Sequence, residues 1–254
     1  MRLVLTLGFV LAFAGSAQAA TPFDLYEQGK FDAAVAAGVA ANDAPGLAIA
    51  ARATLAAETM AGVHCLDCIK RAADYARRAI ALDPQNADAH VFLAVSLGRE
   101  GRLESMFTVL RKGYPKLAKQ ELDAAVAADP HDAQAWAALG GWNIEIVNKG
   151  GATMAKMMYG ATLEAGFADF AKAFAIEPDN VGLLYQYALT LSGYDTAAYR
   201  AKITDALAHA AKATPQGVYE GFAQKRAKEL LATMQKGDMD AYAALVARDQ
   251  GNPG

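Results

Sequence analysis

Apolar residues recur along most of the chain with the spacing of helices that pack on one another. Segments rich in alanine favour helix, and their small side chains let neighbouring helices approach closely. Long alternations of apolar and polar residues, which are typical of strands, are missing, and β-branched residues are scattered. The pattern predicts an all-α fold. The clearest segments are AAVAAGVAA, ARATLAAETMA and AKITDALAHAAKA.

One pattern occurs four times and ends each time at a proline. Its general form is a small residue, a large one four positions later, a small one three positions after that, and a proline five positions on. Each copy predicts a helix with one close-packed face, and the proline prevents the helix from continuing. The four copies are AADYARRAIALDP, AKQELDAAVAADP, GFADFAKAFAIEP and ITDALAHAAKATP, which end at Pro84, Pro130, Pro178 and Pro215.

A second pattern follows the first three prolines and predicts a new helix after each polar turn. Its copies are His90-x2-Leu93-Ala94-x2-Leu97, Trp136-x2-Leu139-Gly140-x2-Asn143 and Leu184-x2-Tyr187-Ala188-x2-Leu191. Together the patterns resemble the tetratricopeptide repeat (TPR), which pairs W-x2-L-G-x2-Y with a later A-x3-F and a closing proline. A fragment with the spacing Tyr26-x2-Gly29-x-Phe31-x2-Ala34 resembles part of a further unit, so the resemblance spans residues 23–231.

This resemblance implies a right-handed solenoid of antiparallel helix pairs, a TPR-like superhelix with four to five units and irregular inserts. We expect it to occupy residues 20–235, followed by a C-terminal helix and frayed tail over 236–254. The proline-to-proline distances are 46, 48 and 37 residues, against about 34 for a standard unit. The excess predicts inserts inside the units, near 106–117 and within 148–165. Such inserts resemble those of exported or organelle-associated repeat proteins: the T-components of TRAP transporters and the regulator-of-microtubule-dynamics type.

The first nineteen residues indicate export. Arg2 precedes an apolar run, and small residues at Ala17 and Ala19 predict a secretory signal peptide over 1–19. The apolar run is shorter than a membrane-spanning helix requires, so we expect a periplasmic bacterial protein with no membrane span after cleavage. The chain has 24 basic and 27 acidic residues and no basic stripe, which argues against a nucleic-acid partner.

The only two cysteines lie in the stretch His64-Cys65-Leu66-Asp67-Cys68. No histidine follows the second cysteine, as haem attachment requires, and zinc would need two more ligands. Thiol–disulfide catalysis would need this motif beside a β-α-β pattern. A structural disulfide between Cys65 and Cys68 is the remaining interpretation, and redox or metal chemistry is the minor alternative. We expect no cofactor and no metal.

Aromatic and methionine residues concentrate in the third and fourth units. Methionines near 154–158 have soft sulfur ligands that suit copper(I), but methionine more commonly fills irregular apolar gaps. Because first helices build the inner face of a solenoid, aromatic and charged residues at helical spacing there are candidate binding residues. The candidate set is Trp136, Trp142, Glu145, Lys149, Met154, Met158, Tyr159 and Tyr187.

No catalytic motif or phosphate loop is present in the sequence. We therefore expect a non-catalytic periplasmic adaptor that binds a protein or peptide on its concave face. The alternative is a transporter-associated binding protein for a small apolar ligand, in which the insert around Tyr159 closes the concave side into a pocket.

Overall fold

The computed structural model describes residues 19–251, and these form thirteen helices with no strand among them. The all-α prediction is therefore confirmed. The predicted signal peptide lies outside the described residues, except for Ala19. The helices are α1 (Pro22–Glu27), α2 (Phe31–Ala41), α3 (Ala44–Ala61), α4 (Leu66–Leu82), α5 (Ala87–Leu103), α6 (Met106–Lys112), α7 (Tyr114–Ala128), α8 (Ala133–Tyr159), α9 (Leu163–Ile176), α10 (Val181–Asp195), α11 (Arg200–Lys212), α12 (Gly217–Lys236) and α13 (Met239–Gln250).

The helix boundaries follow the proline pattern. Helices α4, α7, α9 and α11 each end two or three residues before the predicted prolines. After the first three prolines, the side chains of Asn86, Asp132 and Asn180 accept hydrogen bonds from the first backbone N–H groups of α5, α8 and α10. These caps satisfy donors that have no partner within the helix, so each polar turn starts the next helix.

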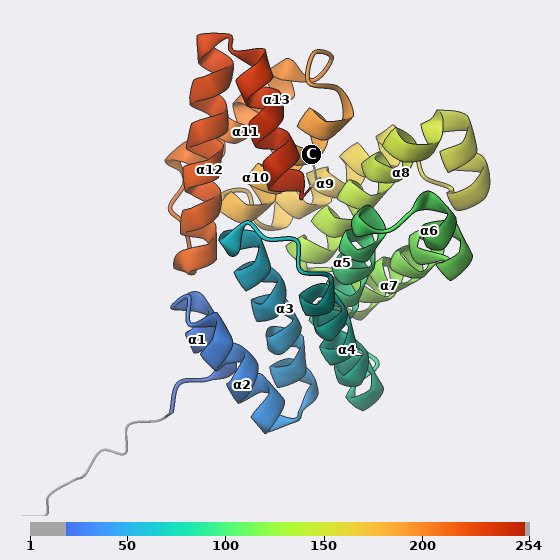
Figure 1. The fold of residues 1–254 in the computed structure, drawn as a ribbon, viewed down its shortest axis with the longest axis vertical. Coiled ribbons are helices and arrows are strands. Elements are labelled where there is room, and N and C mark those ends of the chain that lie inside the picture. The colour runs from blue at the N-terminus through green and yellow to red at the C-terminus, as the bar shows by residue number, and fades with distance from the viewer. Residues whose placement is uncertain (1–18, 252–254) are drawn as a thin grey trace, which may run out of the picture.

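Successive helices pack side by side, as a helical-repeat protein requires. Helix α3 packs on α4, α5 on α7, α8 on α9, and α10 on α11, while α5 and α10 also contact α8. The chain then curves round until α12 meets α1 and α3, as Figure 1 shows at the lower end of α12. At this junction Tyr219 of α12 packs on the cluster that contains Tyr26 and Phe31. The predicted right-handed solenoid itself stays a prediction.

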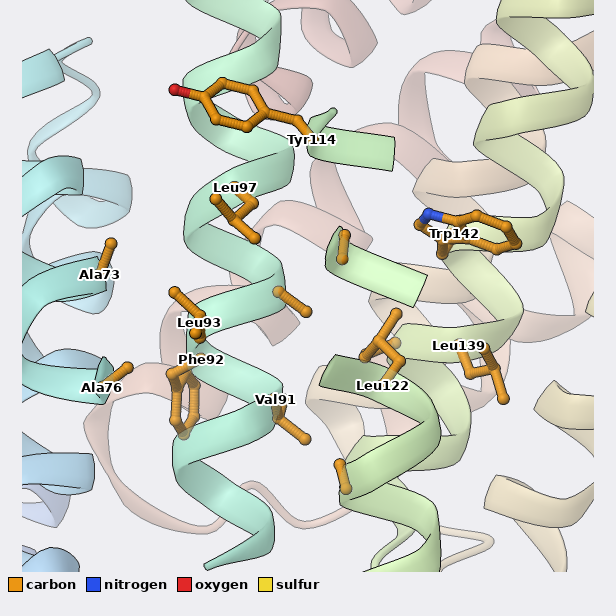
Figure 2. Packing of buried hydrophobic residues seen from close by; sticks show 14 of the residues in the cluster. Ala73, Ala76, Val91, Phe92, Leu93, Leu97, Tyr114, Leu122, Leu139 and Trp142 are labelled. Carbon is orange, nitrogen blue, oxygen red and sulfur yellow. The ribbon is translucent and has the colours of Figure 1, made fainter. Parts of the chain in front are cut away.

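The core between these layers consists largely of small residues. Figure 2 shows Ala73 and Ala76 of α4 facing the large apolar residues of α5, with Leu122 of α7 and Leu139 of α8 beyond them. Both alanines have no exposed surface. Because the backbones approach closely at such positions, added volume has nowhere to go.

Replacing Ala125 or Ala173 with leucine should lower the free energy of unfolding by about 2 kcal/mol. Both residues are completely buried, in α7 and α9 respectively. Urea unfolding measures the change. Ala171→Leu, at an exposed position of α9, is the matched control and should change stability by less than about 0.5 kcal/mol. Equal effects at positions 171 and 173 would contradict the helix register.

The two predicted inserts lie between the helices of their units. The first contains α6 and the start of α7. The second, within residues 148–165, includes Gly151, whose backbone is not helical (φ 71°, ψ 156°), and a helical segment that continues to Tyr159. At the other end, α13 extends from Met239 to Gln250, within the predicted C-terminal helix and tail over 236–254. Residues 252–254 lie outside the described part.

His90 has a structural role at the start of α5, where it is 7% exposed. Its Nδ1 lies 2.6 Å from Glu121 Oε2 of α7, and its Nε2 lies 3.0 Å from the carbonyl oxygen of Pro84. The hydrogen bond to the Glu121 carboxylate raises the pKa of His90 above its ordinary value of 6.5, although burial opposes this. An imidazolium donates to both oxygens, so it joins α5 to α7 and to the preceding turn.

This contact predicts a pH-dependent stability. Because the pKa of His90 is raised in the folded state, its stabilising effect is fully present below pH 6.5 and is lost as the pH rises through the folded-state pKa. His90→Gln should therefore destabilise by about 1 kcal/mol more at pH 5.5 than at pH 9, measured by urea unfolding at both values. Glu121→Gln should remove the same pH dependence. A pH-independent effect of both variants would contradict the assignment.

Candidate functional site

The curved arrangement of helices encloses a partly open central cleft of about 1440 Å³. Its walls come mainly from the inward faces of α3, α5, α8, α10 and α12, together with the last turn of α13. The second helices α4, α7, α9 and α11 lie mostly behind this wall. We refer to this space as the central cleft.

The lining residues recur at intervals of three and four along each inner helix, so one face of each helix points into the central cleft. The α5 face is representative: Asp88, Phe92, Val95, Arg99 and Arg102 line the cleft in that order. The alanine-rich faces of the same helices form the core. Each inner helix thus separates a close-packed face from a polar one.

Ion pairs connect neighbouring inner helices across the cleft floor. Arg99 of α5 donates to Glu58 Oε2 of α3 at 2.6 Å and also to Thr59 Oγ1 at 2.7 Å. One turn further along, Arg102 donates to both carboxylate oxygens of Glu145 of α8, each at 2.8 Å. Glu58 is 8% exposed. These pairs hold three inner helices in register and give the floor a mixed charge.

A third arginine occupies the wall near α1. The Arg52 guanidinium lies 4.5 Å from the ring centre of Tyr26 and 5.8 Å from that of Phe92. Burial raises the pKa of Tyr26 to about 12. Burial also raises the pKa of Asp88, which the nearby Arg52 charge partly offsets. This wall therefore combines a cation, aromatic faces and a partly desolvated carboxyl group.

The opposite wall is formed by α10, α12 and the end of α13. Asp249 of α13 accepts hydrogen bonds from the Tyr185 hydroxyl and from Arg248 Nε, both at 2.7 Å, and lies 3.7 Å from Arg226 Nε. Burial, followed by the nearby Asp249 charge, raises the pKa of Tyr185 well above its ordinary range. Gln250 Nε2 donates to the carbonyl oxygen of Leu189. The last turn of α13 is thereby attached to α10 inside the cleft.

Most of the chain, including the inner helices, matches the sequence model of a known family. Residues 42–235 match the model of regulator of microtubule dynamics protein 1-3, which is 194 of the 254 residues. The chain belongs to this family. Its resemblance to the regulator-of-microtubule-dynamics type is thus confirmed, whereas membership of the TPR family stays a prediction. None of the curated proteins compared with the chain is significantly similar to it in sequence.

The match to the regulator of microtubule dynamics family covers α3 to α11 and nearly all of α12, and hence most of the central cleft. Helices α1, α2 and α13 lie entirely outside it. The attachment of Asp249 and Gln250 to α10 therefore comes from a segment beyond the family match.

Three of the predicted binding residues line the central cleft: Trp142, Glu145 and Lys149. Glu145 binds Arg102, and Lys149 is exposed. Trp142 is 9% exposed, and its Nε1 donates to the carbonyl oxygen of Pro115 at 3.1 Å. Trp142 thus joins α8 to the start of α7 and offers only a small part of its ring to the cleft.

The other five predicted residues do not line the cleft. Trp136 donates to the carbonyl oxygen of Pro130, and the Lys172 amino group lies 3.6 Å from its ring centre. Tyr187 packs against Phe170 and Phe174, and Tyr159 packs edge-on against Trp142. Met154 and Met158 are exposed, at 46% and 55%. The second insert contributes Asn148 and Lys149 at the cleft rim but does not close over it, because it turns outward at Gly151.

Several residues that line the cleft were not predicted, because the predicted set came almost entirely from the third unit and its insert. Arg52, Arg99, Tyr185 and Arg226 all lie at helical spacing from other polar residues on their helices. That periodicity was a usable signal. It did not reveal that the last turn of α13 returns to the cleft, because this contact joins residues 60 or more positions apart.

The cysteines lie near the rim of the cleft, at the start of α4. Cys65 and Cys68 form a disulfide, with Cα atoms 5.1 Å apart, as predicted. His64, next to Cys65, lies beside Gly251 at the end of α13. Within residues 19–251, no three His, Cys, Asp or Glu side chains are grouped to hold a metal ion. No helix in that range is both long and apolar enough to cross a bilayer.

Proposed function

We propose that this protein is a non-catalytic adaptor that binds an extended polypeptide segment in the central cleft. The observation that supports this best is the chemistry of the lining. Cations, carboxylates and aromatic faces alternate along the cleft, from Arg52 and Phe92 to Tyr219 and Arg226. A polypeptide offers both charges, amide groups and apolar side chains to such a surface, as ligands of concave repeat faces do.

The size of the cleft also favours a polypeptide. Small-molecule pockets usually have volumes of about 300–1,000 Å³ and are mainly apolar. The central cleft exceeds that range and is lined by seven arginine or lysine side chains and nine aspartate or glutamate side chains. An apolar small ligand would have to remove water from many of these charges without replacing their hydrogen bonds. The small-molecule alternative is therefore the weaker one.

We also infer that the helix pairs are of TPR type and that the protein acts in the bacterial periplasm. The proline-terminated pairs and the Trp136 motif support the first inference, and the leader sequence over 1–19 supports the second. The family name concerns the regulation of microtubule dynamics. A protein partner for this chain agrees with a regulatory family, and the leader sequence over 1–19 favours a partner in the cell envelope.

Photo-crosslinking within the cell envelope tests the adaptor function. A photoreactive phenylalanine analogue at Gln186, which lines the cleft on α10, should produce a crosslink to a polypeptide after irradiation. The same analogue at Lys225, exposed on α12 and outside the cleft lining, is the matched control and should not. Equal crosslinks from both positions, or none from Gln186, would contradict the proposal. Native mass spectrometry of the same protein shows whether a small molecule is retained instead.

A further inference from the structure

The exposed apolar side chains of this protein are concentrated on its two inserts. Among the described residues, eleven large hydrophobic side chains are exposed, and seven of them lie within 106–117 and 154–158. Phe107 is 76% exposed, and Met157 is 70% exposed. We call these two segments, together with the residues between 148 and 160, the insert surface. Its exposed apolar residues are Met106, Phe107, Leu110, Leu117, Met154, Met157 and Met158.

The two inserts meet at one side of the molecule. Trp142 donates to the carbonyl oxygen of Pro115 in the first insert, and Tyr159 of the second insert packs edge-on against the same indole. Val109 and Ala155, one from each insert, both pack in the same core cluster. Figure 1 shows α6 next to the outer end of α8, at the right edge of the view. The insert surface is therefore one feature assembled from two repeats.

Its charge is opposite to that of the whole chain. Residues 106–117 and 148–160 contain five basic residues and no acidic one, although the chain has 27 acidic residues and a net charge of −3. Lys112 is paired with Glu104 at 2.8 Å. Arg111, Lys116, Lys149 and Lys156 are all exposed. Cations thus surround the exposed phenylalanine, leucine and methionine side chains.

We propose that the insert surface binds a membrane surface rich in anionic lipid. A protein surface that binds a membrane needs apolar side chains that enter the acyl boundary and cations that contact headgroups. Both are present, and the long lysine and arginine side chains reach headgroup level while their stems cover apolar surface. A soluble protein gains nothing by exposing this many large apolar side chains together, unless they contact something. The basic residues of the insert surface favour an anionic partner. A bilayer also fits the seven exposed apolar side chains, because it can deform around them.

This inference goes beyond the adaptor function and depends on different residues. The exposed apolar residues of the insert surface do not line the central cleft. Lys149 belongs to both, at the cleft rim. Membrane binding through the insert surface therefore holds the cleft mouth beside the bilayer and leaves the cleft accessible to a polypeptide.

Vesicle co-sedimentation of the chain without residues 1–19 tests the proposal. The protein should bind vesicles of phosphatidylcholine containing 30% phosphatidylglycerol and should bind pure phosphatidylcholine vesicles at least about tenfold more weakly. Raising the salt concentration to 0.5 M should weaken binding to the anionic vesicles, since surface charges are then screened. Equal binding to both vesicles, or no binding to either, would overturn the proposal.

Matched variants locate the site. The double variant Phe107→Ser/Met157→Ser and the variant Lys156→Glu should each reduce binding to the anionic vesicles about fivefold or more. Leu82→Ser, at a residue 56% exposed on α4, and Lys225→Glu are the controls and should bind like the original chain. Circular dichroism checks that all variants remain folded. If the controls lose as much binding as the insert variants, the insert surface is not the site.

A second copy of the chain is the competing occupant. Sedimentation velocity distinguishes it, because an insert surface that binds another copy gives a dimer that Phe107→Ser/Met157→Ser converts to monomer. Such a dimer, without vesicle binding, would overturn the membrane proposal. A monomer that binds anionic vesicles would support it.

Discussion

Replacing Arg99 with methionine should lower the free energy of unfolding by about 3–4 kcal/mol. The change leaves the Glu58 carboxylate buried in the cleft floor without the guanidinium that lies 2.6 Å from it. Removing one member of a buried ion pair costs about 3–5 kcal/mol because the other charge stays desolvated. The expected effect is near the lower limit because the Arg99 side chain is 21% exposed. Urea unfolding at pH 7 measures it.

The double variant Glu58→Gln/Arg99→Met separates the loss of the pair from the loss of packing. With the carboxylate gone, no buried charge is left without a partner, so the double variant should be more stable than Arg99→Met alone. A double variant as unstable as the sum of the single variants would show that the two side chains act independently. The ion pair would then have no role in holding α3 against α5.

Replacing Gly140 with alanine should destabilise the fold by about 3 kcal/mol. A Cβ at this position of α8 would lie 2.7 Å from Phe170 Cδ2 and 2.9 Å from the carbonyl oxygen of Gly166 in α9. Part of this obstacle is backbone, which cannot rotate away as a flexible side chain does. The helices must therefore separate, and the α8–α9 contact is among the most extensive in the structure. Thermal and urea unfolding both measure the effect.

Gly98→Ala provides the matched control. Gly98 is also inside a helix, α5, but a Cβ there meets no heavy atom within 4 Å. Alanine should therefore stabilise this helix by up to about 1 kcal/mol through its higher helix propensity. If both substitutions stabilise the protein, α8 and α9 are not in close contact at Gly140.

The sequence by itself determined the helices and their grouping into pairs. Proline two or three residues after each second helix, polar caps such as Asn86, and alanine at close contacts act over a few residues, so their effects are readable along the chain. The disulfide was also local, since Cys65 and Cys68 are three residues apart. Positions 142, 145 and 149 were assigned to the inner face from the same helical period.

Only the tertiary structure decided where those helices lead. Contacts between segments far apart in the chain bring α12 against α1 and α3, and no single repeat specifies these contacts. The tertiary structure brings Asp249 beside Tyr185 and encloses a charged cleft, and it turns Met154 and Met158 outward with the second insert. Trp136 and Tyr187 pack between helices and do not line the cleft, and their role in binding a partner stays a prediction. Sequence spacing shows which face a residue occupies, whereas the neighbour of that face depends on contacts between distant segments.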